Sequence, residues 1–208
     1  PIDSITTLPL HQTLGRVSAS AVMAHAAVPG FRASIMDGYA LGQISQPDLG
    51  DTWTLMGRSA AGQPFDGTLT GGEAIRILTG APLPEGAGWV LPQELVAVDD
   101  STLRLVKQAS DRSWIRPEHE ECRPGDTLLE AGRRLGAADL GRLAGCGITD
   151  LEVVAKPRIG ILISGDELIP PGAVRPPGSI WESNGTLLET MLRSLGQSVA
   201  HRRVVADQ

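Results

Sequence analysis

Cysteine is scarce in this sequence, since its 208 residues contain only Cys122 and Cys146. Two cysteines at this spacing, with no CxxC and no cluster of cysteine and histidine, predict neither a zinc site nor a disulfide framework. We therefore expect two reduced, buried thiols. Aromatic residues are also rare, at 3%, whereas the chain has 25 glycines and 15 prolines. This composition favours many turns and short strands.

An excess of positive charge and long hydrophobic runs are absent as well. The net charge is -6, so a role in binding nucleic acid has no electrostatic support. No apolar stretch approaches the roughly 18 residues of a membrane span. The first residues, Pro1-Ile2-Asp3-Ser4, show no signal peptide. We expect a cytoplasmic protein that binds neither nucleic acid nor membrane, with enough hydrophobic content (41%) for a packed core.

The middle of the chain, residues 51–110, has the alternating pattern of β-structure. Five short strands are predicted, at residues 52–56, 73–78, 89–92, 95–98 and 102–106. Apolar residues recur at helical spacing on both sides of this β segment, over residues 5–25 and over residues 135–144. Gly145-Cys146-Gly147 marks the end of the second predicted helix. The two helical segments are expected to pack together, with the β segment inserted between them.

The last part of the chain has the order strand, loop, helix, strand. The run Arg158–Ile163 is predicted to be a buried parallel strand, residues 186–196 a helix, and residues 199–205 a second strand. Asp166 and Glu167 follow the first strand, and Asp207 follows the second. Ligands bind at such strand ends. The three carboxylates are therefore either ligands of a divalent metal or ordinary polar residues that cap a turn and face water.

Three other polar positions also have two interpretations. Asp37, next to Gly38, either meets a ligand in a loop or belongs to an ordinary turn. Thr79, before the stiff loop 80–87, either donates its hydroxyl to an anion or caps that loop. The acidic run Glu118–Glu121 resembles a metal cluster, but no helix or strand fixes its spacing, which favours a solvated loop.

Five stretches, taken in order, resemble the molybdopterin molybdenumtransferase family, the MoeA-like proteins that include the gephyrin E domain. The resemblance covers about residue 8 to residue 208 and depends on the ordered set of motifs. The stretches are Ser34-Ile35-Met36-Asp37-Gly38-Tyr39-Ala40; Thr79-Gly80-Ala81-Pro82-Leu83-Pro84-Glu85-Gly86-Ala87; Pro92-Gln93-Glu94; Ser164-Gly165-Asp166-Glu167-Leu168 with Pro171-Gly172; and Ser183-Asn184.

The resemblance implies a multi-domain fold of α/β and β type that is elongated and usually homodimeric. A discontinuous helical domain would comprise residues 1–23 and 119–155, and an all-β domain, residues 24–118, would be inserted into it. Residues 156–208 would begin an α/β domain of the molybdopterin-binding kind. Members of the family continue for a further segment of comparable length, so we expect this chain to be an N-terminal portion and inactive alone.

The resemblance also implies an activity, the insertion of molybdate into adenylated molybdopterin with release of AMP, assisted by Mg²⁺. Substrates and partners would be adenylated molybdopterin, molybdate and the molybdopterin adenylyltransferase. A non-catalytic scaffold of the gephyrin type is the alternative. The residues implied are catalytic Asp37, Thr79, Glu167 and Asp207; cofactor-binding Ser164, Gly165, Asp166, Ser183 and Asn184; and metal-binding Glu167 and Asp207, with Glu121 at a position where the family usually has an acid.

Overall fold

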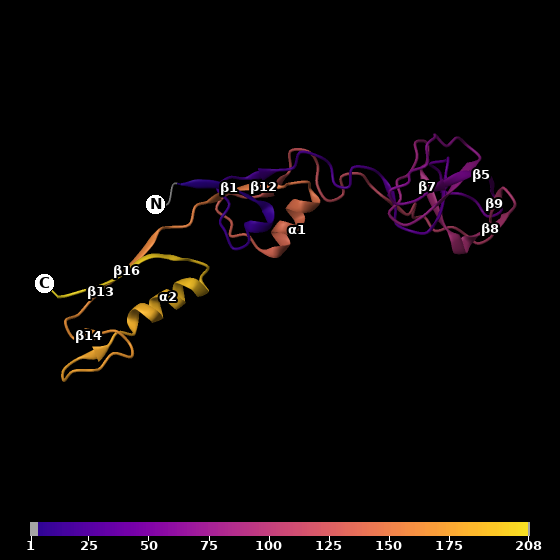
Figure 1. Ribbon diagram of the computed structural model, residues 1–208. Helices are drawn as coiled ribbons and strands as arrows, with labels where there is room; N and C mark the ends of the chain where they lie inside the picture. The colour runs from indigo at the N-terminus through magenta and orange to yellow at the C-terminus, as the bar shows by residue number, and fades with distance from the viewer. Residues whose placement is uncertain (1–3, 208) are drawn as a thin grey trace. The chain divides into compact units, whose positions relative to one another are not determined.

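The structure is a computed structural model that describes residues 4–207, and it divides the chain into two compact units. Unit 1 comprises Pro1–Val22 and Leu129–Gln208, and unit 2 comprises Met23–Leu128. The chain passes from one unit to the other within strands β2 (Val22–Met23) and β11 (Thr127–Leu129), which pair with each other. Figure 1 labels several of the elements and colours the chain by residue number.

Unit 2 is built on a six-stranded sheet with the order β7-β4-β6-β5-β9-β8. Its neighbours are antiparallel except for β5 and β6, which are parallel. The strands are β4 (Gly38–Leu41), β5 (Thr52–Ser59), β6 (Glu73–Ile77), β7 (Trp89–Pro92), β8 (Val96–Asp99) and β9 (Thr102–Leu105), with a short 3-10 helix η2 (Gln93–Leu95) after β7. A separate pair joins β3 (Ala33–Ser34) to β10 (Ile115–Arg116). The predicted β-structure of residues 51–110 is thereby confirmed.

Both faces of this sheet are buried at β4, β6 and β7. Successive side chains of a strand point to opposite faces, and in this part of the sheet both sets contribute buried apolar residues. Leu41, Trp53 and Leu91 belong to one buried cluster, whereas Ala40, Ile75 and Val90 belong to another. The sheet is therefore the centre of the unit 2 core, and its strand ends are held in fixed positions.

Residues 5–25 are not a helix, contrary to the sequence interpretation. They form β1 (Ile5–Pro9), a short 3-10 helix η1 (Leu10–Gln12), irregular structure, and β2. Strand β1 pairs antiparallel with β12 (Asp150–Val154), from Ile5 opposite Val154 to Pro9 opposite Asp150. The N-terminal segment thus lies against residues 150–154 through strand pairing rather than helix packing. The β-branched run Ile5-Thr6-Thr7 favours a strand, and the distant partner strand overrides the local apolar spacing.

The predicted helix at 135–144 is confirmed as α1 (Ala137–Gly145). Leu143 is 1% exposed, and Leu135 is also buried. The Asp139 carboxylate accepts a hydrogen bond from the Gly136 backbone N–H at 2.9 Å, which satisfies a free donor at the helix start. Gly147, in the left-handed region at φ 79°, follows the last turn.

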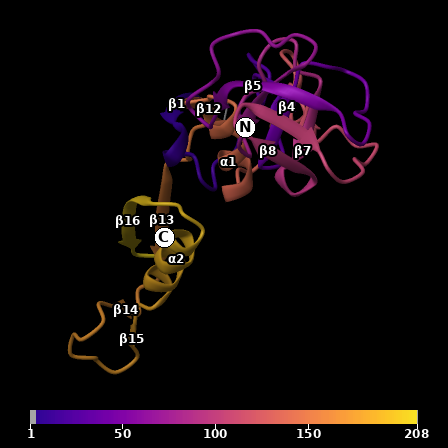
Figure 2. The same ribbon diagram turned by 90° about the vertical axis from the view of Figure 1, so that its right-hand side faces the viewer.

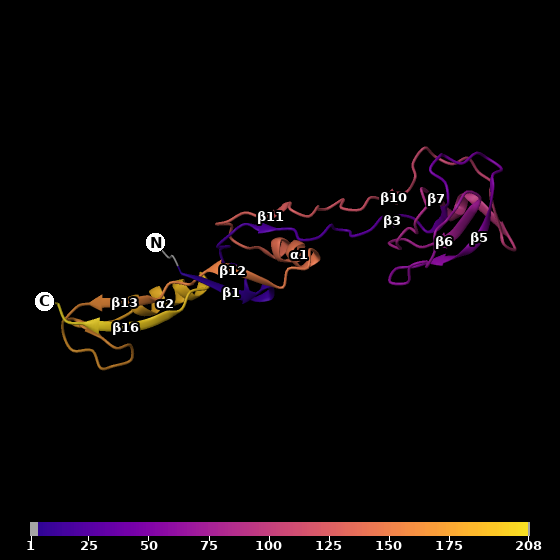
Figure 3. The ribbon, with the colours of Figure 1, turned by 90° about the horizontal axis from the view of Figure 1, so that it is seen from above.

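The last part of unit 1 contains the predicted strand, helix and strand. Strands β13 (Ile159–Ser164) and β16 (Val199–Val205) pair in parallel, and Figure 3 shows them side by side. Helix α2 (Asn184–Ser194) lies alongside this pair (Figure 2). The connection between β13 and α2 contains a second parallel pair, β14 (Leu168–Ile169) with β15 (Ile180–Trp181). Because β13 and β16 are parallel, Ser164 and Val205 lie opposite each other at the same end of the pair.

Two expectations from composition can be compared with the described residues. Cys122 is buried, as expected, whereas Cys146 is only partly buried. Among the helices of residues 4–207, none combines the length and the apolar character that crossing a bilayer requires.

Candidate functional site

Asp37 and Thr79 come together in unit 2 because their strands are paired. Asp37 directly precedes β4 and Thr79 is the second residue after β6, and Gly38 lies opposite Ile77 in the register. The Thr79 backbone N–H donates to Asp37 Oδ1 at 2.7 Å, and the Thr79 hydroxyl donates to the same oxygen at 2.8 Å. A side chain at Gly38 is excluded, because its Cβ would lie 2.0 Å from the Leu91 carbonyl oxygen.

These contacts keep the exposed Asp37 carboxylate ionised. The Thr79 backbone N–H and then its hydroxyl lower the pKa of Asp37, against a smaller opposing effect of desolvation. The positive charge of Arg76 lowers that pKa further. Arg76 stacks on the Tyr39 ring at 4.9 Å and donates to Gln93 Oε1 at 2.5 Å. The sequence analysis did not identify Arg76 as a site residue. Successive side chains of a strand point to opposite faces, so the position of Arg76 between the apolar Ile75 and Ile77 already indicated that it lies on the other face of β6.

This geometry differs from the expectation that the Thr79 hydroxyl donates to an anion, because the hydroxyl already donates to Asp37. The hydroxyl oxygen can therefore only accept from a ligand. Asp37 Oδ2 receives no hydrogen bond from any described residue, and Asp37 is exposed. The arrangement offers one free carboxylate oxygen, which suits a cation or a ligand donor.

Glu121 is engaged in ion pairs of its own loop. Arg116 Nη2 lies 2.7 Å from Glu121 Oε1, and Arg116 Nε pairs with Glu120. These two carboxylates raise the pKa of the Arg116 guanidinium. The loop is exposed, in agreement with the solvated interpretation of the Glu118–Glu121 run.

In unit 1, the parallel pair brings several of the predicted binding residues to one strand end. Ser164 ends β13 and Asn184 begins α2, and both line a cavity of about 320 Å³ whose other walls are leucine and isoleucine. The Gly165 backbone N–H donates to the Val205 carbonyl at 3.2 Å, and the Asp207 backbone N–H donates to Asp166 Oδ1 at 3.2 Å. A polar entrance with an apolar wall is the usual form of a small-molecule site.

The start of α2 is held by a buried carboxylate that sequence reasoning did not identify. Glu182 is 3% exposed, accepts from the Gly185 backbone N–H at 2.6 Å and pairs with Arg202 of β16. The Gly185 hydrogen bond lowers the pKa of Glu182 most, burial opposes this, and Arg202 lowers the pKa further. This pair fixes the position of the neighbouring Ser183, which is the N-cap residue of α2 and is exposed.

The strand-end carboxylates do not form a metal cage by themselves. Within residues 4–207, no three His, Cys, Asp or Glu side chains are close enough to hold an ion, so the trio Asp166, Glu167 and Asp207 is not assembled. Glu167 and Asp207 are exposed, as is Asp166. Mg²⁺ commonly uses one or two carboxylates and completes its coordination with substrate phosphates and water. The residues present fit that mode and not an all-protein site.

Comparison with known proteins gives a consistent result. Residues 1–147 match the family described as MoeA N-terminal region (domain I and II). The chain is 33% identical over 201 residues to the molybdopterin molybdenumtransferase of Haemophilus influenzae, covering 96% of this chain and 50% of that protein. It is 33% identical over 205 residues to molybdopterin molybdenumtransferase 2 of Mycobacterium tuberculosis, covering 97% and 51%.

A solved structure shares the fold. The crystal structure of the molybdopterin biosynthesis MoeA protein from Pyrococcus horikosii matches with a TM-score of 0.86 and 28% identity, over 99% of this chain and 54% of that one. The chain thus spans about half the length of the relatives that it matches. On the match of residues 1–147 and the two relatives named above, the chain belongs to the MoeA family of molybdopterin molybdenumtransferases.

Proposed function

We propose that this chain provides part of a molybdenum cofactor biosynthesis enzyme, which inserts molybdate into adenylated molybdopterin and releases AMP. The observation that carries the proposal is the convergence of Ser164 and Asn184 on one cavity of about 320 Å³ at the end of a parallel strand. Both residues belong to motifs that resemble the family's. The same cavity is too apolar, over Leu162, Leu187 and Leu188, to suit a free inorganic ion alone.

In this proposal, the strand end binds the organic substrate. Ser164 and Asn184 donate hydrogen bonds to its polar groups, and Gly165 allows the backbone to approach closely. Ser183 and Asp166 complete the polar edge. Glu167 and Asp207 are exposed carboxylates on the same strand ends, and we assign them the position nearest to the reacting phosphate.

Asp37 and Thr79 are proposed as a second catalytic element, located in unit 2. The ionised Asp37 presents Oδ2, and Thr79 fixes its orientation through two hydrogen bonds. A carboxylate held in one rotamer loses little entropy on binding a ligand. Glu121 is proposed only as a structural partner of Arg116, in keeping with its ion pair.

Magnesium is proposed as the cofactor, with Glu167 and Asp207 as its protein ligands. When bound, Mg²⁺ neutralises phosphate charge and makes a nucleotide a better leaving group. The chain's own contribution is to supply carboxylates and to exclude water on the apolar side of the cavity.

Several properties of the whole protein are also proposals. Because the chain spans half the length of its relatives, we propose that it does not complete the reaction alone. We further propose a cytoplasmic location, assembly as a homodimer and a transfer partner, the molybdopterin adenylyltransferase. Light scattering of the purified chain tests the homodimer directly.

The first experiment is calorimetric titration of the 208-residue chain with adenylated molybdopterin in the presence of Mg²⁺. We expect Glu167→Gln and Ser164→Ala each to weaken binding by about tenfold, the effect of losing one interaction with a charged group. Asp66→Asn is the matched control, since Asp66 is exposed and remote in sequence from these motifs. It should bind as the unchanged chain does.

Two results would contradict the proposal. Equal binding by all variants would show that the strand end is not the site. An absence of binding to the unchanged chain would show that these residues do not form a working half-site.

A further inference from the structure

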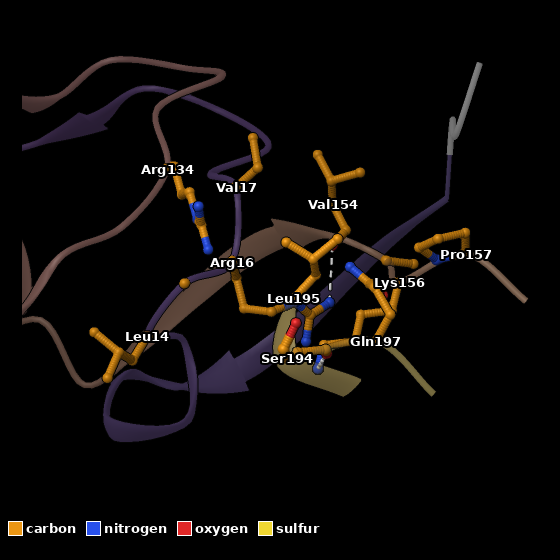
Figure 4. A pocket seen from close by; sticks show the side chains of 13 residues that line it. Leu14, Arg16, Val17, Arg134, Val154, Lys156, Pro157, Ser194, Leu195 and Gln197 are labelled. Carbon is orange, nitrogen blue, oxygen red and sulfur yellow. Dashed lines mark hydrogen bonds between the residues drawn. The ribbon is translucent and has the colours of Figure 1, made fainter. Parts of the chain in front are cut away.

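Unit 1 contains a second, larger cavity of about 390 Å³ that none of the proposed catalytic or cofactor-binding residues lines. It is bounded by residues 14–17, 154–157 and 194–197, together with Arg134 (Figure 4). The last of these segments begins at Ser194, the final residue of α2, whereas the strand-end cavity includes the first residue of that helix, Asn184. The two cavities share no lining residue. This volume falls within the range of small-molecule sites.

The charge of this cavity is uniformly positive. Arg16, Arg134 and Lys156 line it, and no aspartate or glutamate does. None of the three forms an ion pair with a residue in the described range 4–207. Three cations that lie on three segments around the cavity and form no ion pair within the described range create a potential that attracts an anion.

Two of these cations are held in place by backbone oxygens. Arg16 Nη2 donates to the Val154 carbonyl at 2.8 Å, drawn as a dashed line in Figure 4. Lys156 Nζ donates to the Gly196 carbonyl at 2.6 Å. Each retains further N–H donors, because a guanidinium has five and an ammonium has three. Lys156 also offsets the negative end of the α2 dipole, which would otherwise repel an anion.

The third cation is free of such contacts. The Arg134 guanidinium makes no hydrogen bond to any described side chain or carbonyl, and its Nη2 lies 4.0 Å from the position of a Cβ built on Gly15. In Figure 4 it extends from its own loop toward the segment that carries Arg16. An arginine fork recognises phosphate oxygens through two parallel hydrogen bonds. Arg134 is therefore the side chain most available to a ligand.

We propose that this cavity binds a small phosphorylated compound. Arg134 and Arg16 would hold the phosphate, and Lys156 would add positive charge. The proposal is independent of the function proposed above, because it uses neither the strand-end residues nor Asp37 and Thr79.

The test is an NMR titration of the ¹⁵N-labelled 208-residue chain at constant ionic strength. The probes are glycerol 3-phosphate, inorganic phosphate and succinate. We expect saturable shifts at the amides of Gly15, Leu195 and Gly196 with both phosphates, and weaker binding of succinate. Arg134→Gln should raise the dissociation constant of glycerol 3-phosphate by about tenfold.

The matched control is Arg133→Gln, which removes the same charge one residue away. Arg133 is already paired with Asp139 at 2.7 Å and does not line the cavity, so its loss should leave the affinity unchanged.

Three outcomes would overturn the proposal. Equal losses in the Arg133 and Arg134 variants would show a general effect of charge. Equal affinity for succinate would exclude a phosphate site. Shifts confined to Ser164 and Asn184 would place binding in the strand-end cavity instead, and that result would support the other site only.

Discussion

At the scale of single residues, Thr79 controls the ionisation of Asp37. Both of its donors go to the same carboxylate oxygen, and the backbone N–H lowers the pKa of Asp37 more than the hydroxyl does. In Thr79→Val the hydroxyl is lost and the N–H remains. We expect the pKa of Asp37 to rise toward, but not reach, its ordinary value, as measured by NMR titration of the carboxyl carbon.

A second threonine provides the control. Glu73 accepts from the backbone N–H and the hydroxyl of Thr70, both at 2.8 Å, and these bonds lower the pKa of Glu73. Thr70→Val should raise the pKa of Glu73 and leave Asp37 unaffected. If Thr79→Val leaves the Asp37 titration unchanged, the hydroxyl does not donate to this carboxylate.

The same contacts define a pH dependence. Because the folded pKa of Asp37 is lower than the unfolded value, its contribution to stability is fully present above the unfolded pKa. It is lost as the pH falls through the folded pKa, when the carboxylate is protonated. The Thr79→Val variant should therefore lose this contribution at a higher pH than the unchanged chain.

The proximity of Asp37 and Thr79 was not predictable from local sequence. Asp-Gly and a threonine before a proline-rich loop are common in ordinary turns, and only the resemblance to a family singled them out. Their contact depends on the register of β4 against β6, which joins segments far apart in the sequence. Arg76 could have been found from strand alternation, but its neighbours Tyr39 and Gln93 come from other strands or turns.

At the scale of elements, the start of α2 depends on a glycine. A Cβ on Gly185 would lie 2.3 Å from Arg202 Nε and 2.4 Å from its Cζ. Gly185→Ala should therefore displace Arg202 and leave the buried Glu182 carboxylate without its cation, which is unfavourable. We expect the melting temperature to fall by several degrees.

Another helical glycine gives the opposite expectation. Gly141 in α1 has no atom within 4 Å of a Cβ position. Gly141→Ala should raise stability by about 0.5–1 kcal/mol, because alanine loses less backbone entropy on folding. A melting temperature for Gly185→Ala equal to that of the unchanged chain would show that Arg202 can move at no cost.

Helix α1 is anchored by one buried leucine. Leu143 is 1% exposed, whereas Leu140 in the same helix is only partly buried. We expect Leu143→Ala to cost about 2–4 kcal/mol in the free energy of unfolding, from lost burial and the cavity left behind. Leu140→Ala should cost less. Urea denaturation of both variants measures the difference, and equal losses would contradict the assignment of the core face.

The elements that sequence alone could predict are those with local signals. The strands of unit 2 alternate and are separated by turn residues, and α1 and α2 have helical spacing, so their positions were predicted well. Residues 5–25 were predicted wrongly. Leu8, Leu10 and Leu14 imitate helical spacing, but Ile5–Pro9 pairs with β12, a partner that no local window contains.

At the scale of the whole chain, unit 2 is a continuous segment with its own core. Both buried clusters, on the two faces of its sheet, draw all their residues from Met23–Leu128. We expect residues 23–128, expressed alone, to unfold in a single cooperative transition. Fluorescence is a suitable measurement, because Trp53 and Trp89 are 3% and 8% exposed. Emission at the wavelength of solvated tryptophan, or melting without a transition, would contradict this expectation.

Unit 1, in contrast, is closed by two strands from opposite sides of unit 2 in the sequence, β1 and β12. During synthesis β1 leaves the ribosome long before β12 is made. Until then, the backbone N–H and C=O groups of Ile5–Pro9 lack their native hydrogen-bond partners. Unit 2 can fold in that interval, whereas β1 remains an exposed, unpaired edge. The early part of this chain is therefore the segment that a nascent-chain chaperone would protect, until translation reaches Val154.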